Sequence, residues 1–172
     1  GMEFEFAFLL DALQVERDQG ITVDTTQIFF KTKKRNYVFI DAPGHKEFIK
    51  NMITGAASAD IAILIIDVDE GIKAQTKKHA YILKLLGIKR VITLFNKMDK
   101  VNYKEDRYLL VKKRLYDYLL KIDVKGLYDI PISAKIGDNI VKKSKKTKWY
   151  NGKSLTCLLY TSPSPRDFVR SR

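Results

Sequence analysis

Three short polar segments of the chain have the composition of a ligand site. They are Asp41-Ala-Pro-Gly-His45, Asn96-Lys-Met-Asp99 and Ser133-Ala-Lys135, and each follows an apolar run. An apolar run that ends in a polar turn is typical of a buried strand, and ligands bind at the edge where the carboxyl ends of parallel strands meet. The three segments together therefore predict one site at that edge, with phosphate as its expected ligand.

The first segment has the chemistry that a phosphate site requires. Asp41 is suited to hold Mg²⁺ through water, since this ion keeps much of its hydration shell and takes few carboxylates. The alternative for Asp41 is to cap the helix that follows it. Gly44 has no Cβ, so its backbone N–H can come close to a phosphate.

The hydrophobic pattern indicates the elements that position these segments. It predicts strands at about 26–31, at 37–41, 61–67, 91–95 and 129–132, and helices over 4–18, 47–57, 75–86 and 104–122. The first two strands are expected to form an antiparallel hairpin. Strands that alternate with helices of this length predict an α/β fold with a doubly wound, mostly parallel sheet.

Together with Arg17-Asp-Gln-Gly-Ile-Thr22, the three segments resemble the G domain of translation-factor-type GTPases, which has the P-loop NTPase fold. The resemblance covers about residues 3–155 and implies GTP and Mg²⁺ as cofactors. It places His45 where the family has the residue that orients the attacking water, and Thr22 where the family has a threonine that reaches Mg²⁺ and the γ-phosphate. Taken alone, His45 would be an ordinary surface residue and Thr22 an ordinary strand former.

The other two segments resemble the family's guanine-binding motifs. Asp99 would accept hydrogen bonds from the N1–H and the exocyclic amine of guanine, which adenine does not offer. Asn96 would hold the O6 side of the base and the neighbouring loop, and the stem of Lys97 would cover one ring face. In Ser133-Ala134-Lys135, a backbone N–H would point toward O6.

The family's phosphate cradle, Gly-x-x-x-x-Gly-Lys-Ser/Thr, does not occur in the sequence. In the family it follows a strand that lies between the one ending at Asp41 and the one ending at Asp67. Loss of the cradle would remove about 7–15 kcal/mol of contacts to the phosphates. We therefore expect that the chain by itself is a partial G domain that binds no GTP measurably, has a gap in its sheet and does not melt cooperatively.

Further segments resemble one subgroup of this class, the GTPase subunit of sulfate adenylyltransferase. They are Phe8-Leu-Leu-Asp-Ala-Leu13, Asp67-Val-Asp-Glu-Gly71, Leu85-Leu-Gly-Ile-Lys89, Gly137-Asp-Asn139 and Trp149-Tyr-x-Gly152. This likeness implies a partner subunit that forms adenylyl sulfate from ATP and sulfate. Elongation factors, with the ribosome and aminoacyl-tRNA as partners, are the alternative, because they share Asn51-Met-Ile-Thr-Gly55.

The net charge of +12 is concentrated near the end of the chain, because residues 140–172 carry +8 and the first 139 carry only +4. The lysine-rich segment 142–148 is most simply a solvated loop. Its alternative is contact with RNA or an acidic partner, so a non-catalytic nucleic-acid-binding module is a third hypothesis. No apolar run is long enough to cross a membrane, so we expect no membrane partner.

Residues 157–172 are expected to lie outside the G domain, which would then comprise residues 1–156. The segment Cys157-Leu-Leu-Tyr-Thr-Ser-Pro-Ser-Pro-Arg-Asp167 has neither helical nor strand periodicity. Its back-translation resembles a sequencing-library adapter read in frame, and the alternative is a natural Ser/Pro-rich linker. If the adapter interpretation holds, the single cysteine is not native. A chain without cysteine chemistry fits a cytoplasmic location.

Overall fold

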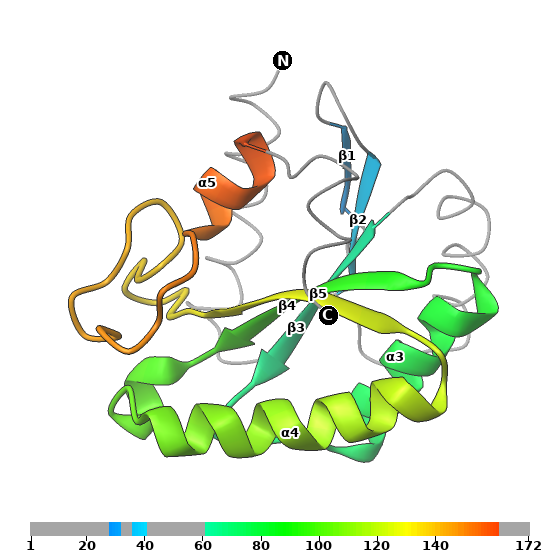
Figure 1. Cartoon of the computed structure of the whole chain (residues 1–172), viewed down its shortest axis with the longest axis horizontal. Coiled ribbons are helices and arrows are strands. Elements are labelled where there is room, and N and C mark those ends of the chain that lie inside the picture. The colour runs from blue at the N-terminus through cyan, green and yellow to red at the C-terminus, as the bar shows by residue number, and fades with distance from the viewer. Residues whose placement is uncertain (1–27, 32–35, 41–60, 162–172) are drawn as a thin grey trace.

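The computed structural model describes residues 28–31, 36–40 and 61–161, which form a five-stranded sheet with helices on both faces (Figure 1). The strands are β1 (Ile28–Lys31), β2 (Asn36–Ile40), β3 (Ile61–Asp67), β4 (Arg90–Asn96) and β5 (Lys125–Pro131). They lie side by side in chain order. β1 and β2 pair antiparallel, and β2 through β5 are parallel. The predicted α/β class with a mostly parallel sheet is thereby confirmed.

The described helices are α3 (Ala74–Leu85), the short 3₁₀ helix η1 (Met98–Val101), α4 (Glu105–Lys121) and α5 (Leu155–Tyr160). The predicted helices over 75–86 and 104–122 correspond to α3 and α4. α3 ends because Gly87 adopts a φ of 73°, and its N–H donates to the carbonyl of Lys84. A glycine in this left-handed conformation is the usual helix stop. The helices expected over 4–18 and 47–57 lie outside the described residues.

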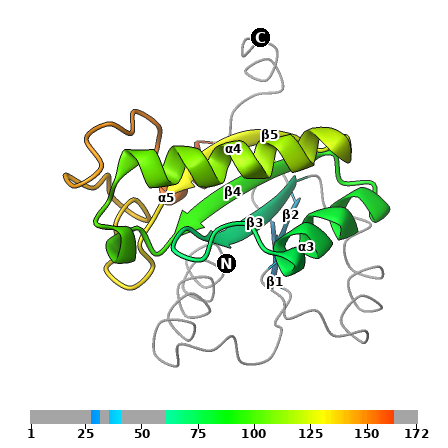
Figure 2. The same cartoon turned by 90° about the horizontal axis from the view of Figure 1, so that it is seen from below.

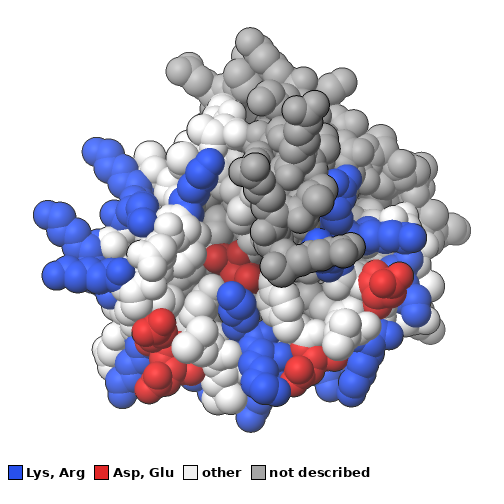
Figure 3. Space-filling model, viewed as in Figure 1, with Lys and Arg blue, Asp and Glu red and all other residues white. Residues whose placement is uncertain are grey.

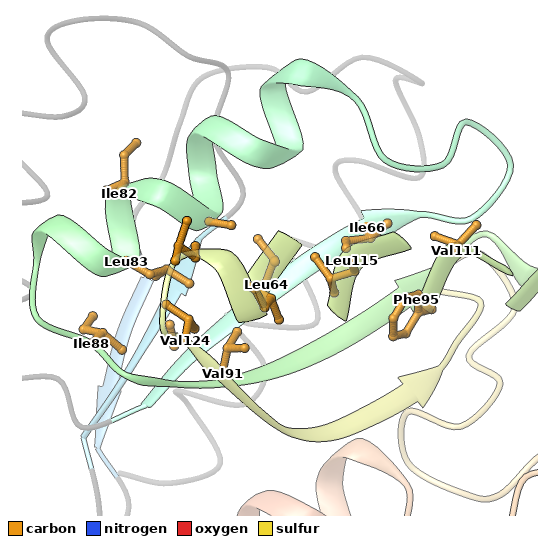
Figure 4. Close-up of a cluster of buried hydrophobic side chains, with 14 of the residues drawn as sticks. Leu64, Ile66, Ile82, Leu83, Ile88, Val91, Phe95, Val111, Leu115 and Val124 are labelled. Carbon is orange, nitrogen blue, oxygen red and sulfur yellow. The ribbon is translucent and has the colours of Figure 1, made fainter. Parts of the chain in front are cut away.

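The sheet separates two hydrophobic clusters, because successive side chains of a strand point to opposite faces. On β3, Ala62, Leu64 and Ile66 lie in the cluster under α3 and α4, and Ile61 and Ile63 lie in the cluster on the α5 face. Figure 4 shows the first cluster, which is closed by side chains of both longer helices. α4 packs on β5 and α3 on β3, as seen from below in Figure 2. Both faces of β3 and β4 are therefore buried.

One face of α4 supplies Tyr108, Val111, Leu115 and Leu119 to the core, at helical spacing. Leu109, the residue after Tyr108, is 47% exposed, because it lies on the solvent side of the helix. Acidic residues occupy the first turn of α4 and Lys121 the last, which matches the helix dipole.

The sheet has no gap between β2 and β3. The resemblance implied another strand between them, whereas here Tyr37 pairs with Ile61 and Ile40 with Leu64. A strand edge presents unpaired backbone N–H and C=O groups, and two neighbouring edges satisfy these groups by pairing with each other. The expected gap in the sheet is therefore wrong, whereas the expected lack of a cooperative melt stays a prediction.

Residues 157–160 belong to α5, although the sequence pattern assigned them to no element. Ser154 caps the helix by accepting a hydrogen bond from the backbone N–H of Cys157. Leu158 and Leu159 are buried against the apolar cluster on that face of the sheet. The pattern missed this helix because it is only six residues long, and its three buried leucines, Leu155, Leu158 and Leu159, span little more than one turn.

The lysine-rich segment 142–148 forms a loop, as predicted. Its lysines are exposed, whereas Thr147 is buried and fixed to Asn139 by a hydrogen bond of 2.8 Å. Figure 3 shows basic side chains projecting on the side where Figure 1 places this loop. Among the described residues, no helix is long and apolar enough to cross a membrane.

Candidate functional site

The carboxyl ends of β3, β4 and β5 meet at one edge of the sheet. In the register of the strands, Asp67 is opposite Asn96, and Phe95 is opposite Pro131. The segments that follow β4 and β5, residues 96–99 and 133–135, are therefore neighbours. We call them the 96–99 loop and the 133–135 loop.

Asn96 joins the two loops. Its side chain is 3% exposed, and its Oδ1 accepts hydrogen bonds from the backbone N–H of Lys97 at 2.8 Å and of Ala134 at 3.0 Å. A backbone hydrogen bond of 3.1 Å from Met98 to Ile132 runs beside this bridge. An amide oxygen that accepts from both loops fixes the distance between them.

Asp99 and Ser133 form the second link. The buried hydroxyl of Ser133 donates to Oδ1 of Asp99 at 2.6 Å, and Asp99 itself is only half-buried. Among the described residues, no group donates a hydrogen bond to the other carboxylate oxygen of Asp99. Oδ2 and a second lone pair of Oδ1 can therefore accept two hydrogen bonds, which matches the N1–H and exocyclic amine edge of guanine, so the residues present fit this base.

Lys97 is held by Asp67. The Lys97 backbone has a φ of 67°, a conformation that is strained for a residue with a side chain. Its Nζ lies 2.7 Å from Oδ2 of Asp67, and Oδ1 of Asp67 accepts from the backbone N–H groups of Asp69 and Glu70. Arg107 fixes the same segment by donating to the carbonyls of Val68 and Asp69. Because Asp67 holds the ammonium group of Lys97 in place, the alkyl part of this side chain is available to cover one face of a bound base.

Replacing Asp67 with Ala tests this arrangement. We expect GTP affinity of the intact protein to fall about tenfold, or about 1.4 kcal/mol, because the Lys97 stem loses its anchor. Isothermal titration with GTP measures the change. Asp69→Ala is the matched control, because Asp69 uses its backbone in this turn and its exposed side chain forms no hydrogen bond or ion pair among the described residues. Equal affinity of the two variants would contradict the assigned role of Asp67.

The structure brings together six of the ten residues that the sequence assigned to the site: Asn96, Lys97, Asp99, Ser133, Ala134 and Lys135. The N–H of Ala134 donates to Asn96, so the backbone N–H expected to point toward O6 stays a prediction for another residue of this segment. Lys135 is exposed at the rim. The remaining four residues, Thr22, Asp41, Gly44 and His45, lie outside the described residues.

Three residues next to the site escaped the sequence analysis: Asp67, Tyr103 and Asp138. Asp67 stands at a strand end like Asn96, so the same rule would have found it. Tyr103 and Asp138 make their contact across 35 positions of the chain. No periodicity or motif signals such a pair.

Metal ligands do not gather among the described residues. The part of the chain from 61 to 161 and the two short strands before it contain no group of three or more His, Cys, Asp or Glu side chains that could hold a metal ion. The residues expected to hold Mg²⁺, Thr22 and Asp41, lie outside this part.

The geometry of these loops agrees with the comparison to known proteins. A family model described as the elongation factor Tu GTP binding domain matches residues 2–161. The chain belongs to this family. Members of this family have a G-domain fold that binds GTP, and the 96–99 and 133–135 loops lie within the matched residues.

Relatives with two different roles match the chain at similar identity. Elongation factor 1-alpha of Thermococcus celer is 46% identical over 96% of this chain, and sulfate adenylyltransferase subunit 1 of Aliarcobacter butzleri is 44% identical over 99%. The same subunit of Teredinibacter turnerae is 43% identical over 94%. The chain spans 34–39% of the length of these relatives. Identity alone therefore does not separate the two roles.

Solved structures of translation GTPases share the fold. A bacterial selenocysteine-specific elongation factor matches 87% of this chain and 24% of its own, with a TM-score of 0.56 and 32% identity. Sup35 complexed with GDP matches 76% of this chain and 33% of its own, with a TM-score of 0.56 and 28% identity. The fold match agrees with the family match.

Proposed function

We propose that the intact protein binds and hydrolyses GTP, and that the 96–99 and 133–135 loops select its guanine base. The observation that carries this proposal is the arrangement of Asn96 and Asp99. Asn96 locks the two loops together, and Ser133 orients the Asp99 carboxylate by one hydrogen bond to Oδ1, which leaves Oδ2 and a second lone pair of Oδ1 to accept two N–H donors. A site built to accept two N–H donors rejects a base that lacks them by several orders of magnitude.

Competition binding tests base selection directly. The intact protein is titrated with a fluorescent guanine nucleotide, which is then displaced by GTP, ITP, XTP or ATP. We expect GTP to displace it at concentrations at least a thousandfold lower than ATP. Equal displacement by ATP would overturn the proposal.

Hydrolysis is proposed to depend on residues 22–45. His45 would orient the attacking water, Gly44 would offer its N–H to the γ-phosphate, and Thr22 and Asp41 would hold Mg²⁺. Bound Mg²⁺ supplies charge neutralisation on the phosphates. The protein's own contribution is then to position the water and the phosphates, since this reaction needs little other chemistry from side chains.

Replacing His45 with Ala is expected to slow GTP hydrolysis about a hundredfold, or about 3 kcal/mol, and to leave GTP affinity near normal. The reason is that positioning of water matters in the transition state and not in the ground state. Single-turnover hydrolysis and equilibrium binding measure the two effects separately. His79→Ala, the other histidine of the chain, is the control and keeps its turnover. Unchanged turnover of His45→Ala would remove His45 from the mechanism.

We further propose that the intact protein is the GTPase subunit of a sulfate adenylyltransferase. The support is the set of segments that resemble this subunit, together with two relatives of that name at 43–44% identity. The partner would be a subunit that adenylylates sulfate with ATP. The second candidate is an elongation factor that delivers aminoacyl-tRNA, which is favoured by relatives at 46% identity.

A reconstitution assay separates these two roles. The intact protein is co-expressed with a candidate ATP-sulfate adenylylating subunit, and adenylyl sulfate formation is measured with and without GTP. GTP-dependent formation of adenylyl sulfate supports the first role. Protection of aminoacyl-tRNA from hydrolysis by the GTP-bound protein, without any effect on adenylyl sulfate formation, supports the second. Genes that neighbour the one encoding this protein supply the candidate partner.

A further inference from the structure

A second connection joins the segments that carry the two loops. The hydroxyl of Tyr103 donates to Oδ2 of Asp138 at 2.6 Å. Nζ of Lys146 lies 3.4 Å from that carboxylate oxygen and from the Tyr103 hydroxyl, and 4.8 Å from the centre of the Tyr103 ring. The side chain of Asp138 is 17% exposed, so this contact is mostly shielded from water.

Both partners are fixed to the loops through their backbones. The N–H of Tyr103 donates to the carbonyl of Met98, inside the 96–99 loop, at 2.9 Å. The carbonyl of Asp138 accepts from the N–H of Ser133, in the 133–135 loop, at 3.3 Å. The Tyr103–Asp138 contact therefore ties the residue before Asp99 to the residue that orients Asp99.

The backbone after Asp99 is strained in a way that requires support. Asn102 and Tyr103 have φ values of 52° and 54°, in the left-handed region that residues with side chains rarely adopt. Such a residue costs about 1–3 kcal/mol and persists where its surroundings over-determine it. For Tyr103 those surroundings are Asp138 and Trp149, whose Nε1 donates to the Tyr103 carbonyl at 3.1 Å.

The charges of the cluster favour this contact at neutral pH. Burial opposes ionisation of Asp138, but hydrogen bonds from Tyr103, Ser144 and Lys146 outweigh it, so the pKa of Asp138 lies below its ordinary value. Burial, and then the hydrogen bond to Asp138, raise the pKa of Tyr103. Asp138 is thus ionised and Tyr103 is neutral, which gives a charge-assisted hydrogen bond.

We propose that Asp138 is a positioning residue for guanine recognition, which acts by holding Tyr103 and thereby setting where the Asp99 carboxylate stands relative to the 133–135 loop. This inference rests on the proposed guanine site. Asp138 itself makes no contact with the base. Its loss moves Asp99, so it weakens the contacts of Asp99 more than other contacts to the nucleotide.

The ratio of GTP to ITP affinity in the intact protein tests this inference. Hypoxanthine keeps the N1–H of guanine and lacks the exocyclic amine, so the ratio reports the second hydrogen bond to Asp99. For Asp138→Ala and Tyr103→Phe we expect GTP affinity to fall about tenfold and ITP affinity about twofold, so the ratio falls about fivefold. Asp138→Asn keeps an acceptor oxygen for Tyr103 and is expected to restore most of the ratio.

The control is Asp117→Ala, because on the exposed face of α4 Asp117 forms an ion pair of 3.0 Å with Lys113 and, within the part of the chain that the structure describes, has no contact with either loop. It is expected to leave the ratio unchanged. If Asp138→Ala does not fold, Tyr103→Phe still decides, since it removes one hydroxyl. An unchanged ratio of GTP to ITP affinity in Tyr103→Phe overturns the inference, whether or not urea unfolding shows that the variant has lost stability. If the unmodified protein shows no preference for GTP over ATP, the proposed function itself fails, which is a different result.

Discussion

Asp99→Asn is expected to convert the preference of the intact protein from guanine to xanthine nucleotides. Oδ1 of Asp99 accepts the Ser133 hydroxyl at 2.6 Å, so the amide of the variant is expected to keep its oxygen at that position. The amide nitrogen then faces the position of the exocyclic amine. With bound guanine, the amide N–H of the variant and the exocyclic N–H of the base would face each other as two donors. Xanthine has a carbonyl oxygen at the same position, which accepts a hydrogen bond from the amide.

The expected size of this switch is large. We expect GTP affinity to fall about a thousandfold, or about 4 kcal/mol, and XTP affinity to rise by a similar factor. Competition binding with the two nucleotides measures both changes. Asp123→Asn, an exposed aspartate next to the end of α4, is the matched control and is expected to change neither. Retained selectivity for GTP in Asp99→Asn contradicts the assignment of Asp99.

Ser133 gives the prediction a second test. In Asp99→Asn, Ser133→Ala removes the hydroxyl that is expected to orient the amide. The double variant is therefore expected to bind XTP more weakly than Asp99→Asn alone, because the amide is free to rotate. A double variant with the same XTP affinity would show that Ser133 does not orient residue 99.

The sequence was sufficient to predict the parallel part of the sheet and the meeting of the two loops. β3 and β4 are mostly continuous apolar runs, and polar residues follow β4 and the apolar end of β5, so the strand ends indicated where Asn96, Asp99 and Ser133 lie. β5 begins earlier than the predicted strand at 129–132, because its first half contains Lys125 and Gly126 and has no apolar pattern. This works because parallel strands are buried on both faces and their carboxyl ends share an edge.

Other features of the site depend on contacts between distant residues, which a local pattern does not contain. The left-handed backbone of Lys97 and its contact with Asp67, 30 positions away, are one example. The hydrogen bond from the Ala134 N–H to Asn96 is another example, because a sequence motif does not show which donors are already bonded to other residues of the site. The pairing of β2 with β3 satisfies the backbone hydrogen-bonding groups at the edges of both strands. The resemblance to the family did not predict this pairing.

Asn96→Ala is expected to lower the GTP affinity of the intact protein about a thousandfold, an effect as large as that of Asp99→Asn. Asn96 is buried, and its Oδ1 is the acceptor for the N–H groups of Lys97 and Ala134. Each N–H left without an acceptor costs about 1–3 kcal/mol. The loops are therefore expected to leave the arrangement that binds the base. Restoring that arrangement on binding, together with the lost direct contact of Asn96 with the base, is expected to reduce the binding free energy by about 4 kcal/mol, a thousandfold in affinity.

Thermal shifts separate the binding effect from a general loss of stability. The intact Asn96→Ala protein is melted with and without saturating GTP, and its affinity is measured by titration. The control Asn151→Ala removes an exposed amide and is expected to keep the full GTP-induced shift. If the two loops were held by their backbone contacts alone, Asn96→Ala would bind GTP within tenfold of the unmodified protein. That result would leave Asn96 without its bridging role, because the Met98–Ile132 hydrogen bond of 3.1 Å would then suffice to keep Asp99 in place.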